Sequence, residues 1–402
     1  MNRYPADSRV IVEPLARQPD TDGVLVGRKD TAVFLLLPTD AVEVLDDLAA
    51  GCTVAEAQQR HFARHGEVAD VEDLLATLEE HGFVRPEGTA RREAEKGFHF
   101  AWISERWAQR LTSIPVLAAG ALVVGAAILA LILEPSTLPG WRAAYFPENT
   151  AAGLLALMVF GLFTTFIHEM AHLTAARARG VSCRFGIGNQ LWFLVWETDM
   201  TGIWALPRRQ RYLPILAGPL IDLVTAAALI VVSYANVRGW LALDPAVVQF
   251  GRALLLIYVL RIVWQCYFFL RTDFYYALTN LLGCRNLMGD TVVLLRNITA
   301  RLRRKPLTDQ SHVPEGERRM LRAYAVIWLA GRGIAFSMLL FIQLPLLFHY
   351  LQLLVASVRE GTWRAAPSGV SLITAIFFTI FLLGGLGLWL KRLWWPGKDT
   401  GV

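Results

Sequence analysis

The residues with the clearest chemical potential form the pentapeptide His168-Glu169-Met170-Ala171-His172. On a helix the two histidines lie about one turn apart on the same face, so their imidazoles can hold one Zn²⁺ between them. Glu169 projects beside that metal, where a carboxylate can take a proton from a bound water molecule. The pattern predicts metal-assisted hydrolysis, with His168 and His172 as ligands and Glu169 as the general base. The alternative is a pair of structural histidines on an apolar helix.

A catalytic zinc usually takes three protein ligands and one water, so a third ligand must come from elsewhere in the chain. Asp273 is the best candidate, because it follows the apolar run 251–270 at the same predicted membrane face as the two histidines. The charge rule that assigns this face is independent of the histidine motif. The alternative for Asp273 is an ordinary solvated carboxylate at a helix end.

The apolar residues of the chain gather in long runs. Of its 402 residues, 54% are hydrophobic and only 18% are charged. Runs of about 20 apolar residues are long enough to cross the hydrocarbon core of a lipid bilayer. We predict about six transmembrane helices, at residues 114–133, 151–175, 212–235, 251–270, 324–354 and 372–390. The predicted fold class is therefore an all-α, multi-pass membrane domain over residues 113–402.

Basic residues border these runs unevenly. They are concentrated in residues 177–211, 285–305 and 391–398, and are sparser in residues 134–150, 236–250 and 356–368. Because Lys and Arg accumulate in cytoplasmic loops, we expect both termini in the cytoplasm and the protein in the inner or plasma membrane. The four cysteines form no CxxC pair, which fits a reducing compartment. No apolar segment opens the chain, so no signal peptide is expected.

Residues 1–90 predict a small soluble domain of the α+β class. Strand-like residues precede three helices, at 24–26 and 33–37 for the strands and 39–50, 53–64 and 71–81 for the helices. Over residues 20–86 this order resembles the PqqD-like peptide-recognition domain, with Pro38 before the first helix and Glu80-His81-Gly82-Phe83-Val84 after the third. The resemblance implies a winged-helix-like fold that binds the leader of a precursor peptide. The alternative is a generic small helical domain.

The predicted helices of this domain are acidic, which opposes contact with phosphate groups, so we expect no nucleic-acid partner. Residues 91–112 predict a charged helical connector between the two domains. Trp102 and Trp107 within it are typical of a membrane interface.

Three motifs in order carry a second resemblance. They are the pentapeptide 168–172, Ala217-Gly218-Pro219 and Leu270-Arg271-Thr272-Asp273-Phe274-Tyr275-Tyr276. Over residues 150–290 the chain resembles the site-2 protease family of intramembrane zinc metallopeptidases. Within that family it is similar to the peptide-maturation branch, where the third-ligand motif reads Leu-Asp-Gly-Tyr-Tyr and a Tyr-Thr-Asp segment precedes the Gly-Pro motif. Here Trp196-Glu197-Thr198-Asp199-Met200 stands in the place of that segment.

The resemblance implies a zinc metalloendopeptidase that removes the leader of a ribosomally synthesised precursor peptide near the cytoplasmic membrane face. The expected substrate-binding residues are Asn189, Asp199, Gly218, Pro219 and Asp222. The expected partners are the precursor peptide and the lipid bilayer, with peptide-modifying enzymes or an exporter as further candidates. One alternative is a regulated protease of a membrane-anchored regulator. Another is a non-catalytic peptide exporter or immunity scaffold, although a structural zinc site would not need Glu169 as a base.

Two positions depart from the family's pattern. Phe274 replaces the Gly after the ligand aspartate, and Asp222 replaces a common Asn three residues after Gly-Pro. Asp222 lies about 15 Å into the third span, and Arg261 lies about as deep in the fourth. Neither charge is tolerable alone at that depth, so we expect an ion pair that locks these spans and holds Asp273 against the zinc. The alternative is that Asp222 faces a water-filled cavity. Arg332 is a second buried cation, with no obvious partner.

Residues 185–204 are apolar and aromatic but too interrupted by Gly, Asn and Thr to form a span. We predict a re-entrant hairpin that presents an edge to an extended substrate, because main-chain pairing holds a peptide straight. The alternative is an interfacial loop.

Overall fold

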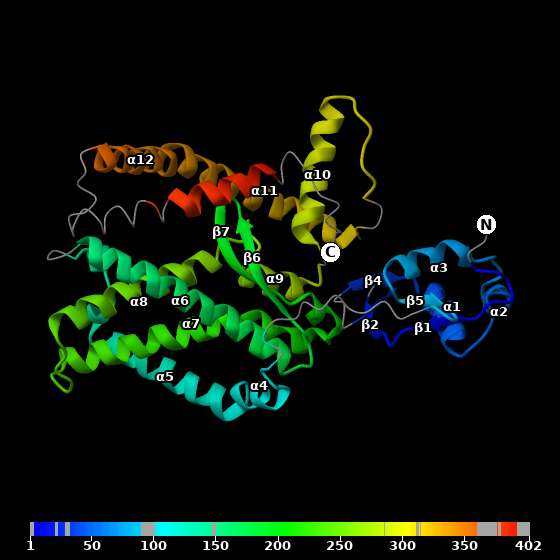
Figure 1. The fold of residues 1–402 in the computed structure, drawn as a ribbon, viewed down its shortest axis with the longest axis horizontal. Helices are drawn as coiled ribbons and strands as arrows, with labels where there is room; N and C mark the ends of the chain where they lie inside the picture. Colours follow the sequence, from blue (N-terminus) through cyan, green and yellow to red (C-terminus); the bar gives the residue numbers. More distant parts are fainter. Residues whose placement is uncertain are drawn as a thin grey trace. The chain divides into compact units, whose positions relative to one another are not determined.

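The computed structural model describes residues 4–20, 23–28, 33–89, 100, 102–146, 150–284, 286–310, 313, 315–359, 376 and 379–391. The chain divides into two compact units, and each is described by itself. The first comprises Met1–Gln109, Leu173–Phe185 and Thr198–Pro214, and the second comprises Arg110–His172, Gly186–Glu197 and Ile215–Val402. The predicted domain boundary at residue 90 lies outside the described residues. Figure 1 labels the helices and strands.

The N-terminal part of the first unit combines sheets and helices. Its elements are β1 (Val10–Val12), β2 (Ala16–Asp20), β3 (Gly23–Arg28), β4 (Val33–Leu37), α1 (Thr39–Ala49), α2 (Val54–His65), α3 (Val71–Glu80) and β5 (Val84–Pro86). Strands β2, β3 and β4 form an antiparallel sheet in that order, and β1 pairs with β5. The predicted strands and helices are confirmed. The winged-helix assignment stays a prediction.

Local sequence explains where these elements begin and end. Thr53 and Glu56 form a capping box at the start of α2, and Gly66 ends the helix with a left-handed φ of 72°. Strand β2 lacks the apolar alternation that predicts a strand. It also contains Pro19, which has no N–H to donate and is tolerated because β2 is an edge strand. The apolar faces of the helices and sheets meet in one core, which includes Val26, Leu45 and Leu75.

The second unit is built from long apolar helices. They include α5 (Ile114–Leu133), α6 (Thr150–Arg177), α7 (Arg208–Val237), α8 (Pro245–Gln265), α11 (Glu315–Met338) and α12 (Leu344–Arg359), with the π-helical segment η4 (Leu339–Gln343) between the last two. Within the described residues, five helical stretches are long and apolar enough to cross a membrane. By length and composition they are those of a membrane protein.

The prediction of about six spans is met in part. Each of the first five predicted runs overlaps one of the five helical stretches, the fifth of which joins α11, η4 and the start of α12. Most of residues 372–378, where the sixth run begins, lie outside the described residues. The described part of the apolar helix that follows, Thr379–Lys391, is shorter than the length that crosses a bilayer.

The boundary predicted for the fourth span is wrong. Helix α8 ends at Gln265 instead of continuing to Leu270, and Asp273 opens a separate helix, α9 (Asp273–Leu282). The turn between them is rich in apolar and aromatic residues, so hydropathy alone does not reveal the break. Thr272 caps α9 by accepting a hydrogen bond from the backbone N–H of Tyr275 (3.3 Å). Helix α10 (Leu287–Leu302) follows α9.

The interrupted segment after α6 folds as a hairpin, as predicted, while its re-entrant position in the membrane stays a prediction. Strands β6 (Arg184–Gln190) and β7 (Phe193–Asp199) pair across a two-residue connection, which requires an antiparallel arrangement. The connection is buried, and Trp192 Nε1 donates to Gln343 Oε1 of η4 (2.5 Å). The segment η3 (Thr201–Ala205) follows the hairpin and belongs to the first unit. It packs against the β2-β3-β4 sheet of that same unit.

Candidate metal centre

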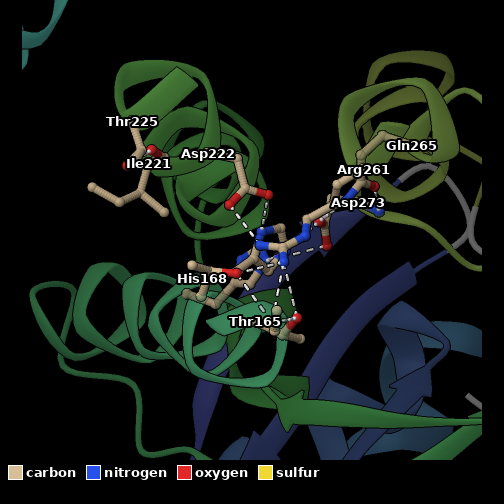
Figure 2. A network of polar contacts seen from close by, with 11 residues as sticks. Thr165, His168, Ile221, Asp222, Thr225, Arg261, Gln265 and Asp273 are labelled. Atoms are coloured by element: carbon tan, nitrogen blue, oxygen red, sulfur yellow. Dashed lines mark hydrogen bonds and ion pairs between the residues drawn. The ribbon is translucent and has the colours of Figure 1, made fainter. Parts of the chain in front are cut away.

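Helices α6 and α9 bring three potential metal ligands together. The Nε2 atoms of His168 and His172 lie 3.2 Å apart. His168 Nε2 is 3.1 Å from Asp273 Oδ2, and His172 Nε2 is 3.3 Å from Asp273 Oδ1. Among the described residues this is the group of His, Cys, Asp and Glu side chains that could hold a metal ion. The predicted convergence of the histidine motif with Asp273 is therefore present in the fold (Figure 2).

The spacing of the three ligand atoms fits a small tetrahedral ion. An ion with ligand bonds of about 2.0–2.1 Å holds neighbouring ligand atoms about 3.3 Å apart. The two Nε2 atoms lie 3.2 Å apart, and each lies 3.1 or 3.3 Å from one of the two carboxylate oxygens of Asp273, so the separations are close to that value. Two imidazoles and one carboxylate suit zinc and also other divalent transition metals. The geometry supports a metal site, while zinc itself remains a prediction from the motif.

Asp273 has the charge state that a ligand needs. Burial raises the pKa of its carboxyl group, but in the metal-free site the protonated imidazoles of His172 and His168 outweigh burial and hold the pKa well below its usual range. The carboxylate is therefore ionised, which is the form that binds a metal.

Gly218 of α7 provides the space for the two imidazoles. A Cβ atom at this position would lie 2.3 Å from His172 Nε2 and 2.4 Å from His168 Nε2. The backbone of α7 therefore forms one wall of the metal centre, and any side chain larger than hydrogen collides with the ligand atoms. Pro219 follows and is buried. Gly218 was predicted to bind substrate; the structure places it against the ligand nitrogens, and its contact with substrate is untested.

The predicted pair between Asp222 and Arg261 is confirmed. Arg261 Nη1 donates to Asp222 Oδ1 at 3.0 Å, between α7 and α8. The other carboxylate oxygen, Oδ2, lies 2.7 Å from Nδ1 of His168. Asp222 is only 2% exposed, so both of its oxygens are occupied by protein groups away from solvent. The pair thus contacts a ligand histidine directly, and substrate contact by Asp222 remains only a prediction.

Gln265 is a functional candidate that the sequence reasoning misses. It is the last residue of α8, and its side chain spans the turn to α9 with two hydrogen bonds to Asp273. Its Nε2 donates to Asp273 Oδ2 (2.9 Å), and its Oε1 accepts from the Asp273 backbone N–H (3.0 Å). Thr272 Oγ1 donates to the Gln265 carbonyl and closes the same turn (2.8 Å). The available signal was a polar residue inside an apolar run of the sequence.

The remaining predicted residues occupy different surroundings. Glu169 is half-buried on α6, between the two ligand histidines in sequence. Asn189 of β6 donates to the Leu191 carbonyl at the hairpin turn (2.9 Å). Asp199 ends β7 and accepts from the Thr201 backbone N–H (3.0 Å). The structure gives the last two residues a local role in the hairpin, and their contact with substrate is untested.

Arg332, for which no partner was evident, stacks on an aromatic ring. Its guanidinium carbon lies 5.0 Å from the centre of the Trp328 ring, one turn earlier on α11. A cation over an indole face is a recognised way to accommodate an arginine away from water.

Comparison of the chain with protein-family models, with curated proteins and with solved structures finds no match. The chemistry of the site therefore rests on its residues and geometry.

Proposed function

We propose that this chain is an intramembrane zinc metalloprotease that removes the leader of a ribosomally synthesised precursor peptide. The observation that carries the proposal is the convergence of His168, His172 and Asp273 beside the carboxylate-bearing Glu169 on an apolar helix. A structural metal site has no need of that carboxylate, whereas hydrolysis does. We further propose that the protein lies in the inner or plasma membrane with both termini in the cytoplasm.

The roles of the residues follow from their chemistry. His168, His172 and Asp273 would hold the metal, which when bound supplies a water of lowered pKa and polarises the scissile carbonyl. Glu169 would accept a proton from the attacking water and pass it to the leaving amine. The half-buried position of Glu169 supports this role, because a proton acceptor must be reached by water and still lie close to the ligands.

The β6-β7 hairpin is suited to align the substrate. Gln190 Nε2 donates to the Arg271 carbonyl (3.2 Å), two residues before Asp273. The ring of Trp196 on β7 also lies near the ring of Phe166, with 6.4 Å between the ring centres. Phe166 is two residues before His168 on α6. The hairpin therefore flanks the metal centre, where an extended peptide could pair with a strand edge.

The N-terminal domain would act as a capture module. Binding of the leader by this domain would raise the effective concentration of the cleavage region at the metal centre. The acidic helices α1 and α3 support a peptide partner over a nucleic acid.

The test is metal content and hydrolysis of the full chain, purified in detergent and returned to vesicles. We expect about one zinc per chain, retained by Glu169→Gln and weakened by Asp273→Ala. Single-span reporter peptides in the same vesicles, followed by mass spectrometry, should be cut by wild type and left intact by Glu169→Gln. Absence of zinc from wild type would overturn the proposal. Zinc binding without hydrolysis of any reporter would favour the exporter or immunity scaffold.

A further inference from the structure

The polar side chains behind His168 come from α6, α7 and α8 and form one continuous network (Figure 2). Asp222 contacts His168 Nδ1 through one oxygen (2.7 Å) and Arg261 through the other (3.0 Å). Arg261 Nη2 then donates to the hydroxyls of Thr164 (2.8 Å) and Thr165 (3.0 Å), which are on the same helix as His168. The network therefore begins and ends on α6.

This arrangement determines which nitrogen of His168 can bind a metal. A carboxylate paired with a guanidinium can only accept hydrogen bonds, so Nδ1 of His168 must carry the proton and donate to Asp222. In the neutral imidazole the lone pair is then on Nε2. That is the atom that faces His172 and Asp273.

The charges of the network cancel. A carboxylate alone would orient the imidazole equally well, but an isolated charge in an apolar span is costly. Arg261 balances Asp222, and its second nitrogen is satisfied by two hydroxyls, so the acceptor for His168 is held without net charge. An ion pair that only joined α7 to α8 would need one oxygen of Asp222, Oδ1. It would not explain why the other oxygen, Oδ2, contacts His168.

We propose that Asp222 and Arg261 are positioning residues, which hold His168 in the tautomer and orientation that ligate the metal. The inference rests on the proposed metal centre and extends it to two residues outside the ligand set of His168, His172 and Asp273. Partners in this position typically change metal affinity by about 10–100-fold when they are removed.

The experiment measures Zn²⁺ affinity by competition with a chromophoric chelator, using the full chain in detergent. The visible absorption of the Co²⁺-loaded protein reports ligand geometry, and thermal unfolding is recorded in parallel. The variants are Asp222→Asn, Arg261→Met and the double substitution. Each single variant leaves one buried charge without its partner, whereas the double variant leaves neither and retains an amide oxygen that can accept from His168.

We expect each single variant to bind Zn²⁺ about 10–100-fold more weakly than wild type, with an altered Co²⁺ spectrum. The double variant should recover part of the affinity and most of the thermal stability. Thr291→Val serves as the matched control, because Thr291 is a buried helical threonine bonded to the carbonyl four residues earlier (2.7 Å), on α10. It should leave affinity and spectrum unchanged.

The outcomes separate this inference from the proposed function. Wild type that binds metal, with folded variants of equal affinity and unchanged Co²⁺ spectra, would show that the pair only joins helices and would overturn the inference alone. Wild type that binds no metal would overturn the inference together with the metal centre. If both single variants fail to fold, the pair Asp222→Leu and Arg261→Met in one chain decides, because it leaves no buried charge and offers His168 no acceptor: wild-type affinity in that protein contradicts a positioning role.

Discussion

Substitution of Gly218 by alanine tests whether α7 forms a wall of the metal centre. The new Cβ would lie 2.3 Å from His172 Nε2, and real Cβ atoms essentially never approach another heavy atom closer than 3.0 Å. The imidazole or the helix must therefore move by at least about 0.7 Å, the difference between these two distances. Ligand distances in a working metal site vary by only about 0.2 Å. The added methyl group is thus incompatible with the observed ligand positions.

We expect Gly218→Ala to lower Zn²⁺ affinity by more than about 100-fold, which exceeds the usual effect of losing an outer partner of a ligand. The assay is chelator competition on the purified full chain, with helix content followed by circular dichroism. Alanine is the better helix former by about 1 kcal/mol, so a loss of affinity could not be attributed to a weaker α7.

Gly125→Ala is the control for this substitution. Gly125 lies on the apolar helix α5, and a Cβ there would meet nothing within 4 Å. This variant should bind metal as wild type does. Wild-type affinity in Gly218→Ala, with a correctly folded protein, would refute the geometry described for the site.

Three further predictions concern the ligand clamp, the metal and the N-terminal domain. Gln265→Leu should weaken Co²⁺ binding by about 10–100-fold in a spectroscopic titration, because Asp273 loses both side-chain hydrogen bonds that orient it; unchanged binding would exclude the clamp. Removal of the metal by a chelator should abolish hydrolysis reversibly. The circular dichroism spectrum should stay unchanged, because packing between the helices maintains the fold without the metal. Irreversible unfolding would contradict this prediction. Burial raises the pKa of Asp47, but hydrogen bonds from Arg64 and Arg60 outweigh it and hold that pKa below its ordinary 3.8. The stability that results is present above about pH 4 and is lost as the pH falls through the lower pKa of the folded state. Asp47→Asn should therefore flatten the acid side of the plot of unfolding free energy against pH. An unchanged plot would refute this role of Asp47.

The convergence of His168, His172 and Asp273 was predictable because the features that bring them together can be read from the linear sequence. The histidine spacing predicts a shared helix face, and the basic loops independently predict that Asp273 lies at the same end of the bundle. The depth of Asp222 and Arg261 in their runs predicts their pairing, since two opposite charges in an apolar layer have few other partners. In each case a strong energetic penalty removes the alternatives.

The parts that escaped prediction depend on how the helices rotate against one another. No spacing rule places Thr164 and Thr165 beside Arg261, or the backbone of Gly218 against two imidazoles. The end of α8 at Gln265 was hidden because aromatic residues continue the apolar run through the turn. Hydropathy measures the preference for lipid and cannot measure backbone direction.

The carboxylate of Asp222 and the guanidinium of Arg261 depend on each other, because each neutralises the charge of the other. An asparagine at position 222 would be a neutral amide, which needs no counter-charge in an apolar span. Asp222 offers His168 a stronger acceptor, because a charge-assisted hydrogen bond is about twice as strong as a neutral one. The same charge would be costly at that depth without Arg261, whose guanidinium also lies over the ring of Tyr258, 5.3 Å from its centre. The two charges must therefore be present together or absent together, and a single substitution at either position should be more damaging than the exchange of both.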